Sequence, residues 1–180
     1  MTDHDMTGSD TPTSRVGTTY NIPPAPPDPD STDWFDVGPL RLGIEYRKVD
    51  PTALDAIYAD SEHLDELHEK SPDGGFTDEG VSVHVVSIED DHEFVRFDMF
   101  VDEPHYHYVD KSAGTNTIVL FDSVALGPVV PWTLGQLRSR LPDMLRHAGG
   151  VGVADQVTTE LGAEVADRVE AHLRSIGELS

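Results

Sequence analysis

The feature that most restricts the fold is a series of short segments in which apolar and polar side chains alternate. The alternation runs through residues 40–47, 81–86, 94–101 and 105–108, and a β-branched and apolar run follows at 115–123. A period of two residues is typical of a strand whose two faces meet different surroundings. The connections between the last four segments are too short for the crossover that parallel strands require. We therefore expect an antiparallel meander of about five strands.

Helical periodicity occupies much of the remaining sequence. Asp50-Pro51 offers an N-cap followed by a first-turn proline and predicts a helix over about 51–69. An apolar stripe over 132–145 predicts a second helix, which Pro142 should kink or break. Apolar residues recur every three or four positions over about 154–177, which predicts a third. The expected fold class is α+β, with the helices packed on one face of the antiparallel sheet.

Composition divides the chain into three parts. Residues 1–36 are rich in proline and aspartate and poor in apolar side chains, so they predict a disordered tail. Residues 37–148 are expected to form the α+β domain. Residues 149–180 are expected to form an amphipathic helix that packs on the domain or on a partner, which includes the possibility of a homo-oligomer.

The charge balance excludes several classes of partner. The chain carries 12 Lys+Arg against 34 Asp+Glu, a formal net charge of −22. Nucleic acids and anionic membranes are bound by clustered cations, so neither is expected as a partner. No run approaches the roughly 20 apolar residues of a membrane-spanning helix, and the first residues lack the apolar core of a signal peptide. We therefore expect a cytoplasmic protein. The absence of cysteine excludes disulfides and thiolate chemistry.

The acidic composition also predicts a salty solvent. Lysine is confined to Lys48, Lys70 and Lys111, whereas the acidic residues are spread along the whole chain. Repulsion among so many carboxylates destabilises a compact state in dilute buffer. At molar salt the Debye length falls to about 3 Å, and this repulsion is largely screened. The composition resembles that of halophilic archaeal proteins.

A histidine pair is the strongest candidate for chemistry. His105 and His107 lie two residues apart, so on a strand both imidazoles project from the same face. Asp98 lies in the preceding strand and can face them across an antiparallel pair. Two imidazoles and one carboxylate form a ligand set for a divalent transition metal and leave coordination positions open. His84 and Asp110 are possible additional ligands.

Other interpretations of the same residues remain open. The two histidines can instead lie in solvent or bond to neighbouring carboxylates such as Asp98 and Glu103, while Tyr106 and Tyr108 pack on the core. Arg96 and Asp98 can then form a cross-strand ion pair of small energetic effect. The histidines can also serve acid–base chemistry without a metal.

Three short motifs resemble a known family. They are Arg-Phe-Asp-Met-Phe at 96–100, Pro-His-Tyr-His-Tyr at 104–108 and Leu-Arg-Ser-Arg-Leu-Pro-Asp-Met-Leu at 137–145. The pattern is similar to that of a family of small domains of unknown function in haloarchaea and other prokaryotes, over about residues 38–148. The resemblance implies a self-standing domain. It implies no catalytic or binding residues.

Three functions are consistent with these observations. The first is a non-enzymatic interaction or accessory protein, because no catalytic signature is present and the last helix is amphipathic. The second is a metal-binding protein or metal-dependent enzyme that uses His105 and His107 with Asp98. The third is a small-ligand binder that uses the same region without a metal.

Overall fold

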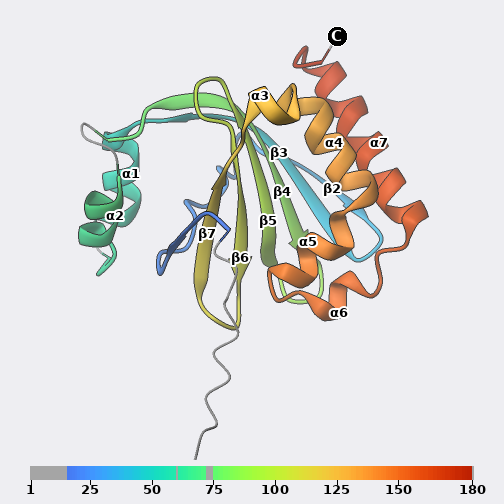
Figure 1. Cartoon of the computed structure of the whole chain (residues 1–180), viewed down its shortest axis with the longest axis horizontal. Helices are drawn as coiled ribbons and strands as arrows, with labels where there is room; N and C mark the ends of the chain where they lie inside the picture. The colour runs from blue at the N-terminus through green and yellow to red at the C-terminus, as the bar shows by residue number, and fades with distance from the viewer. Residues whose placement is uncertain (1–15, 60, 72–74, 180) are drawn as a thin grey trace, which may run out of the picture.

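All strands of the described chain belong to one antiparallel sheet (Figure 1). The computed structural model describes residues 16–59, 61–71 and 75–179. Within them the sheet has seven strands in the order β1-β7-β6-β5-β4-β3-β2. Their bounds are β1 (Thr18–Tyr20), β2 (Asp33–Val37), β3 (Leu40–Val49), β4 (Asp78–Ser87), β5 (His92–Phe100), β6 (His105–Asp110) and β7 (Thr115–Leu120). The meander is confirmed from β2 to β7, but the expected number of about five strands was too small.

The two strands that were not expected lie in the segment predicted to be a disordered tail. β2 forms a hairpin with β3, and β1 pairs with β7 at the opposite edge of the sheet, with Thr18 facing Ile118. The prediction of disorder is therefore wrong for this part of the tail, and residues 1–15 lie outside the described residues. Composition misled because groups on the domain, those of Arg47 and Tyr58, donate hydrogen bonds to carbonyl groups of this segment.

The helices follow the predicted segments with additional breaks. In the described residues they are α1 (Pro51–Tyr58), α2 (Leu64–Lys70), α3 (Ser123–Leu126), α4 (Val129–Ser139), α5 (Leu141–His147), α6 (Val151–Ala154) and α7 (Thr159–Ser175). The helix expected over 51–69 is thus two helices. Pro142 lies in the first turn of α5, so the chain breaks just before it, as its missing N–H group predicts. None of these helices has the length and apolar character needed to cross a membrane.

One face of the sheet holds the apolar core. Alternate residues of β3, β4 and β5 pack there against α4, α5 and α7. The apolar side of α7, including Val165, Val169 and Leu173, is buried in this core, and α7 packs on α4 and β2 of the same chain. The amphipathic character of this helix is therefore explained by packing within the chain.

The opposite face of the sheet carries buried polar residues in two cross-strand rows. The first row follows the register Glu45, Ser82, Asp98, His105, and the second follows Gly43, His84, Arg96, His107. Every side chain in the two rows beyond glycine is at most 8% exposed. Helices α1 and α2, which lie apart from the C-terminal helices, contribute to a cavity over this face (Figure 1). The expectation that helices would cover only one face is therefore incomplete.

A crossing segment, defined here as residues 21–32, connects the two edges of the sheet. It leaves β1 beside β7 and reaches β2 at the far edge. Its proline-rich part, residues 22–27, has few N–H groups, so the carbonyl groups there remain available to other donors. The Arg47 guanidinium donates to the carbonyl groups of Ala25 and Pro26, and the Tyr58 hydroxyl donates to that of Pro23. These bonds fix the crossing segment beside the polar face.

Candidate metal centre

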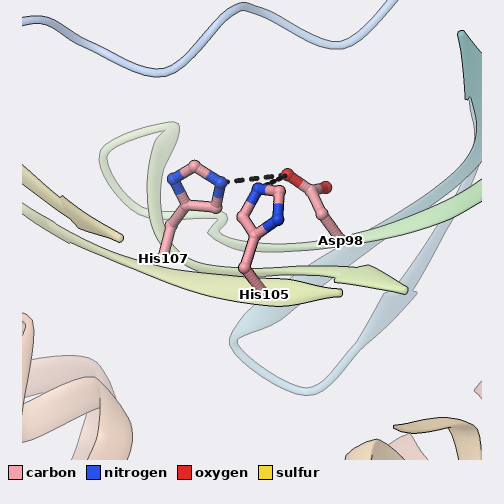
Figure 2. A group of neighbouring side chains, drawn as sticks. All are labelled: Asp98, His105 and His107. Carbon is pink, nitrogen blue, oxygen red and sulfur yellow. Dashed lines mark hydrogen bonds and ion pairs between the residues drawn. The ribbon is translucent and has the colours of Figure 1, made fainter. Parts of the chain in front are cut away.

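Asp98, His105 and His107 converge at the polar face (Figure 2). Asp98 on β5 is directly opposite His105 on β6, and the spacing of two residues places both imidazoles on the same side. The Nε2 atoms of His107 and His105 lie 2.9 and 3.3 Å from the same carboxylate oxygen, Oδ2 of Asp98. One ligand atom from each of the three residues lies within 4.8 Å of the others. Histidines lying in solvent are excluded, because both are buried, whereas the alternative in which they bond to a neighbouring carboxylate agrees with their contacts to Asp98.

The atoms that do not face the centre have their own partners. His105 Nδ1 lies 2.7 Å from the carbonyl oxygen of Glu103, and His107 Nδ1 lies 2.9 Å from Oδ1 of Asn116. A carbonyl oxygen only accepts, so Nδ1 of each ring carries a proton. The hydroxyl of Ser82 donates to the other oxygen of Asp98 at 2.5 Å. The Nε2 atom of each ring faces the shared carboxylate oxygen and bonds to it.

The electrostatics of the three residues are strongly coupled. Burial raises the pKa of Asp98, but the hydrogen bonds from both histidines outweigh it and hold this pKa well below the usual value. Burial lowers the pKa of His105, and Asp98 more than compensates, so this pKa is raised. Burial dominates for His107, whose pKa is lowered. The Asp98 carboxylate thus favours a protonated, positively charged His105, but not a protonated His107 as well.

A cavity of about 450 Å³ opens over these residues. Asp98, His105 and His107 lie in its lining, together with aromatic and aliphatic side chains and with residues of the crossing segment. The volume falls within the range of small-molecule sites, roughly 300–1,000 Å³. The three side chains are thus buried in the protein but accessible from a space that a small ligand can enter.

The two residues considered as additional ligands lie elsewhere. His84 is on the same face, but its Nδ1 and Nε2 atoms bond to Glu93 at 2.6 Å and to Glu45 at 3.0 Å. Asp110 is at the far end of β6, where it accepts hydrogen bonds from Ser112 and from the backbone N–H of Ala113. Neither residue joins the cluster.

A buried ion network adjoins the cluster and was not expected from the sequence. Arg96 donates from Nε and Nη2 to the two oxygens of Glu93, at 2.8 and 2.7 Å. Because a register shift interrupts the pairing of β4 with β5 beside Glu93, this side chain departs from the simple alternation and reaches Arg96 and His84. The ion pair of Arg96 with Asp98, considered as an alternative, is replaced by this one. The available signal of burial was the position of Arg96 and Asp98 among the apolar residues of β5.

Three arginines in and between α4 and α5 are paired at the surface. Arg138 contacts Asp167 at 2.6 Å, Arg140 contacts Asp143 at 3.1 Å, and Arg146 contacts Asp155 at 2.8 Å. These exposed pairs account for the arginines as part of a solvated helix surface.

Comparison with known proteins identifies a family. No curated protein and no solved structure matches the chain. The family described as Domain of unknown function (DUF7700) matches residues 34–173, a range that contains Asp98, His105 and His107 and excludes β1 and the crossing segment. The match spans most of the sequence, and the chain therefore belongs to the DUF7700 family of domains of unknown function.

Proposed function

We propose that this protein binds one divalent transition-metal ion through Asp98 Oδ2, His105 Nε2 and His107 Nε2. The observation that carries the proposal is the convergence of two imidazoles on one buried carboxylate oxygen. Both Nε2 atoms lie within 3.3 Å of Asp98 Oδ2, while both Nδ1–H groups donate to carbonyl oxygens. A divalent cation would take the place of the proton between each Nε2 atom and this oxygen, because metal binding to histidine releases protons. Histidine ligands of metals commonly donate their second ring N–H to such carbonyl groups.

The distances support the same proposal. Ligand atoms about 2.1 Å from a metal lie roughly 3.0–3.4 Å apart at octahedral to tetrahedral angles. The separations of 2.9 and 3.3 Å between Asp98 Oδ2 and the two Nε2 atoms are close to these values. Two imidazoles and a carboxylate suit zinc, iron(II), manganese and nickel, and three protein ligands leave positions open toward the cavity. An ion held this way can bind and polarise a small ligand.

The first test uses the unaltered protein. It is stripped with a chelator in about 2 M KCl, which screens the acidic surface, and then titrated with Zn²⁺ by calorimetry. We expect one equivalent to bind. With ¹⁵N-histidine, Zn²⁺ should shift the Nε2 resonances of two of the nine histidines and leave their Nδ1 atoms protonated. If Zn²⁺ binds no more than the buffer background, or shifts no histidine Nε2 resonance, the proposal is wrong.

Variants then assign the ligands. Asp98→Asn and His107→Gln should each weaken Zn²⁺ binding about 100-fold or more. The matched control is His68→Gln, because His68 and Asp55 form an exposed histidine–aspartate pair at 2.7 Å outside the cavity. Circular dichroism verifies that each variant is folded. Equal Zn²⁺ affinity in the folded site variants and the control would contradict the assignment.

A further inference from the structure

Arg96 brings a buried cation with an unused donor to the same cavity. Its Nε and Nη2 atoms are occupied by Glu93, whereas Nη1 has no hydrogen-bond partner among the described residues. In that part of the chain, Thr133 Oγ1 is the only fully enclosed side-chain nitrogen or oxygen without a partner. Nη1 of Arg96 therefore borders open space. Because Arg96 lines the cavity beside Asp98, that space is the cavity.

Three cations line the cavity of a protein that is strongly anionic. They are Arg47, Lys70 and Arg96. Two carboxylates, Asp98 and Glu103, line it as well, and the three cations are paired with Glu45, Glu66 and Glu93. The charge of Arg96 also reaches the opposite wall. Burial raises the pKa of Tyr58, and the positive charge of Arg96 offsets part of that rise. The feature of the lining that favours an anionic group is therefore the unused Nη1 donor of the Arg96 guanidinium.

The remaining walls of the cavity are apolar. The rings of Phe76 and Phe100 stack with centroids 6.2 Å apart, and both meet the edge of His105, at 5.9 and 5.4 Å. Leu54 and Ile118 add aliphatic surface. A ligand that fits this lining has an apolar body and one charged end.

We propose that the cavity binds a small monocarboxylic acid, with its carboxylate between Arg96 Nη1 and the Asp98–His105–His107 centre and its apolar body against Phe76 and Phe100. The inference rests on the proposed function in one respect, because the metal would supply the second anchor for the carboxylate. A guanidinium whose other nitrogens are already fixed by Glu93 is oriented before the acid arrives, so little ordering is required on binding.

The test compares acids with their uncharged amides. Phenylacetate, hexanoate and cyclohexanecarboxylate are titrated against the zinc-loaded and the metal-free protein, each beside its amide, and ligand NMR reports binding. We expect at least one acid to bind about 10-fold or more tightly than its amide to the zinc-loaded protein, with a smaller preference remaining without zinc. If no acid is preferred over its amide in either form, the inference fails even though zinc binding itself stands.

The opposite failure is also distinguishable. If the protein binds no Zn²⁺ but the metal-free form still prefers the acid, the proposed metal function is wrong and the role of Arg96 stands. The double variant Glu93→Gln/Arg96→Gln removes one positive and one negative charge and should abolish the preference for the acid. The control Arg138→Gln/Asp167→Asn removes an exposed pair of the same kind and should retain it. Equal preference in both folded double variants overturns the inference.

The role of Arg96 also has a readout that needs no variant. In the unaltered protein, binding of the preferred acid should shift the guanidinium ¹⁵N resonances of one buried arginine. It should also produce contacts between the protons of the acid and the rings of Phe76 and Phe100. An acid that binds with no contact to either ring lies outside this cavity, and the assignment then fails.

Discussion

Asp78 controls the loop that precedes His105, so its removal should affect both stability and the metal centre. Its buried carboxylate accepts hydrogen bonds from the backbone N–H groups of Asp102 at 3.2 Å and Glu103 at 2.8 Å. The carbonyl group of Glu103 in turn accepts from Nδ1 of His105. Asp78 is thus a positioning residue that acts on the imidazole of His105 through one peptide unit.

The size of the effect follows from these bonds. Hydrogen bonds to a charged group contribute about 1.5–3 kcal/mol each, and the loop is exposed enough for water to replace part of that contribution. We therefore expect Asp78→Ala to lower the free energy of unfolding by about 2–4 kcal/mol. Zn²⁺ affinity should fall about 10- to 100-fold, the usual effect of losing a group that orients a metal ligand.

Urea denaturation in about 2 M KCl, followed by circular dichroism, measures the first quantity, and calorimetric titration measures the second. Asp110→Ala is the matched control, because Asp110 also accepts backbone N–H groups, but in an exposed turn far from the centre. It should cost about 1 kcal/mol and leave Zn²⁺ binding unchanged. An Asp78→Ala protein within about 0.5 kcal/mol of the unaltered protein, or one with full Zn²⁺ affinity, would refute the reasoning.

Three further predictions concern the fold. Lowering KCl from about 2 to 0.1 M should lower the melting temperature, since the exposed carboxylates are then unscreened; a melting temperature independent of salt would contradict a halophilic character. Burial lowers the pKa of His84, but its hydrogen bonds to Glu45 and Glu93 outweigh burial and raise this pKa above the usual value. Protonated His84 therefore stabilises the fold fully below about pH 6.5, and this stabilisation is lost as the pH rises through the raised pKa. Urea titrations at a series of pH values should show this loss in the unaltered protein and not in His84→Gln. If the free energy of unfolding depends on pH in the same way in both proteins, His84 is not the cause. Gly80 has a φ of 158°, and a Cβ there would lie 2.6 Å from the carbonyl oxygen of Met99. Gly80→Ala should therefore lower the free energy of unfolding, measured by urea denaturation, by at least about 2 kcal/mol. An unchanged free energy of unfolding would show that β4 and β5 separate freely.

The part of the site that the sequence predicted depends on local geometry alone. The period of two places His105 and His107 on one face, and the short turn at Pro104 brings β5 back beside β6. These two facts suffice to bring Asp98 opposite His105. The same locality explains why the meander and the break before Pro142 were predicted correctly.

The parts that were missed depend on contacts between residues far apart in the sequence. Glu93 reaches Arg96 and His84 only because the register of β4 and β5 shifts, and no local pattern marks such a shift. The proline-rich residues have little tendency to form ordered structure by themselves, and they become ordered because Arg47 and Tyr58 supply donors for their carbonyl groups. Composition describes what a segment does alone, not what a neighbouring surface offers it.

The position of β1 has a consequence for the order of folding. During synthesis β1 leaves the ribosome before the other strands described, yet its partner β7 emerges only after β2 to β6. The meander can form from neighbouring hairpins, whereas docking of the crossing segment requires closure of a very long loop. We expect this segment to be the last to attach on the nascent chain and the first to detach in native-state hydrogen exchange. The centre would then be exposed to ions from solution before its outer wall closes over it.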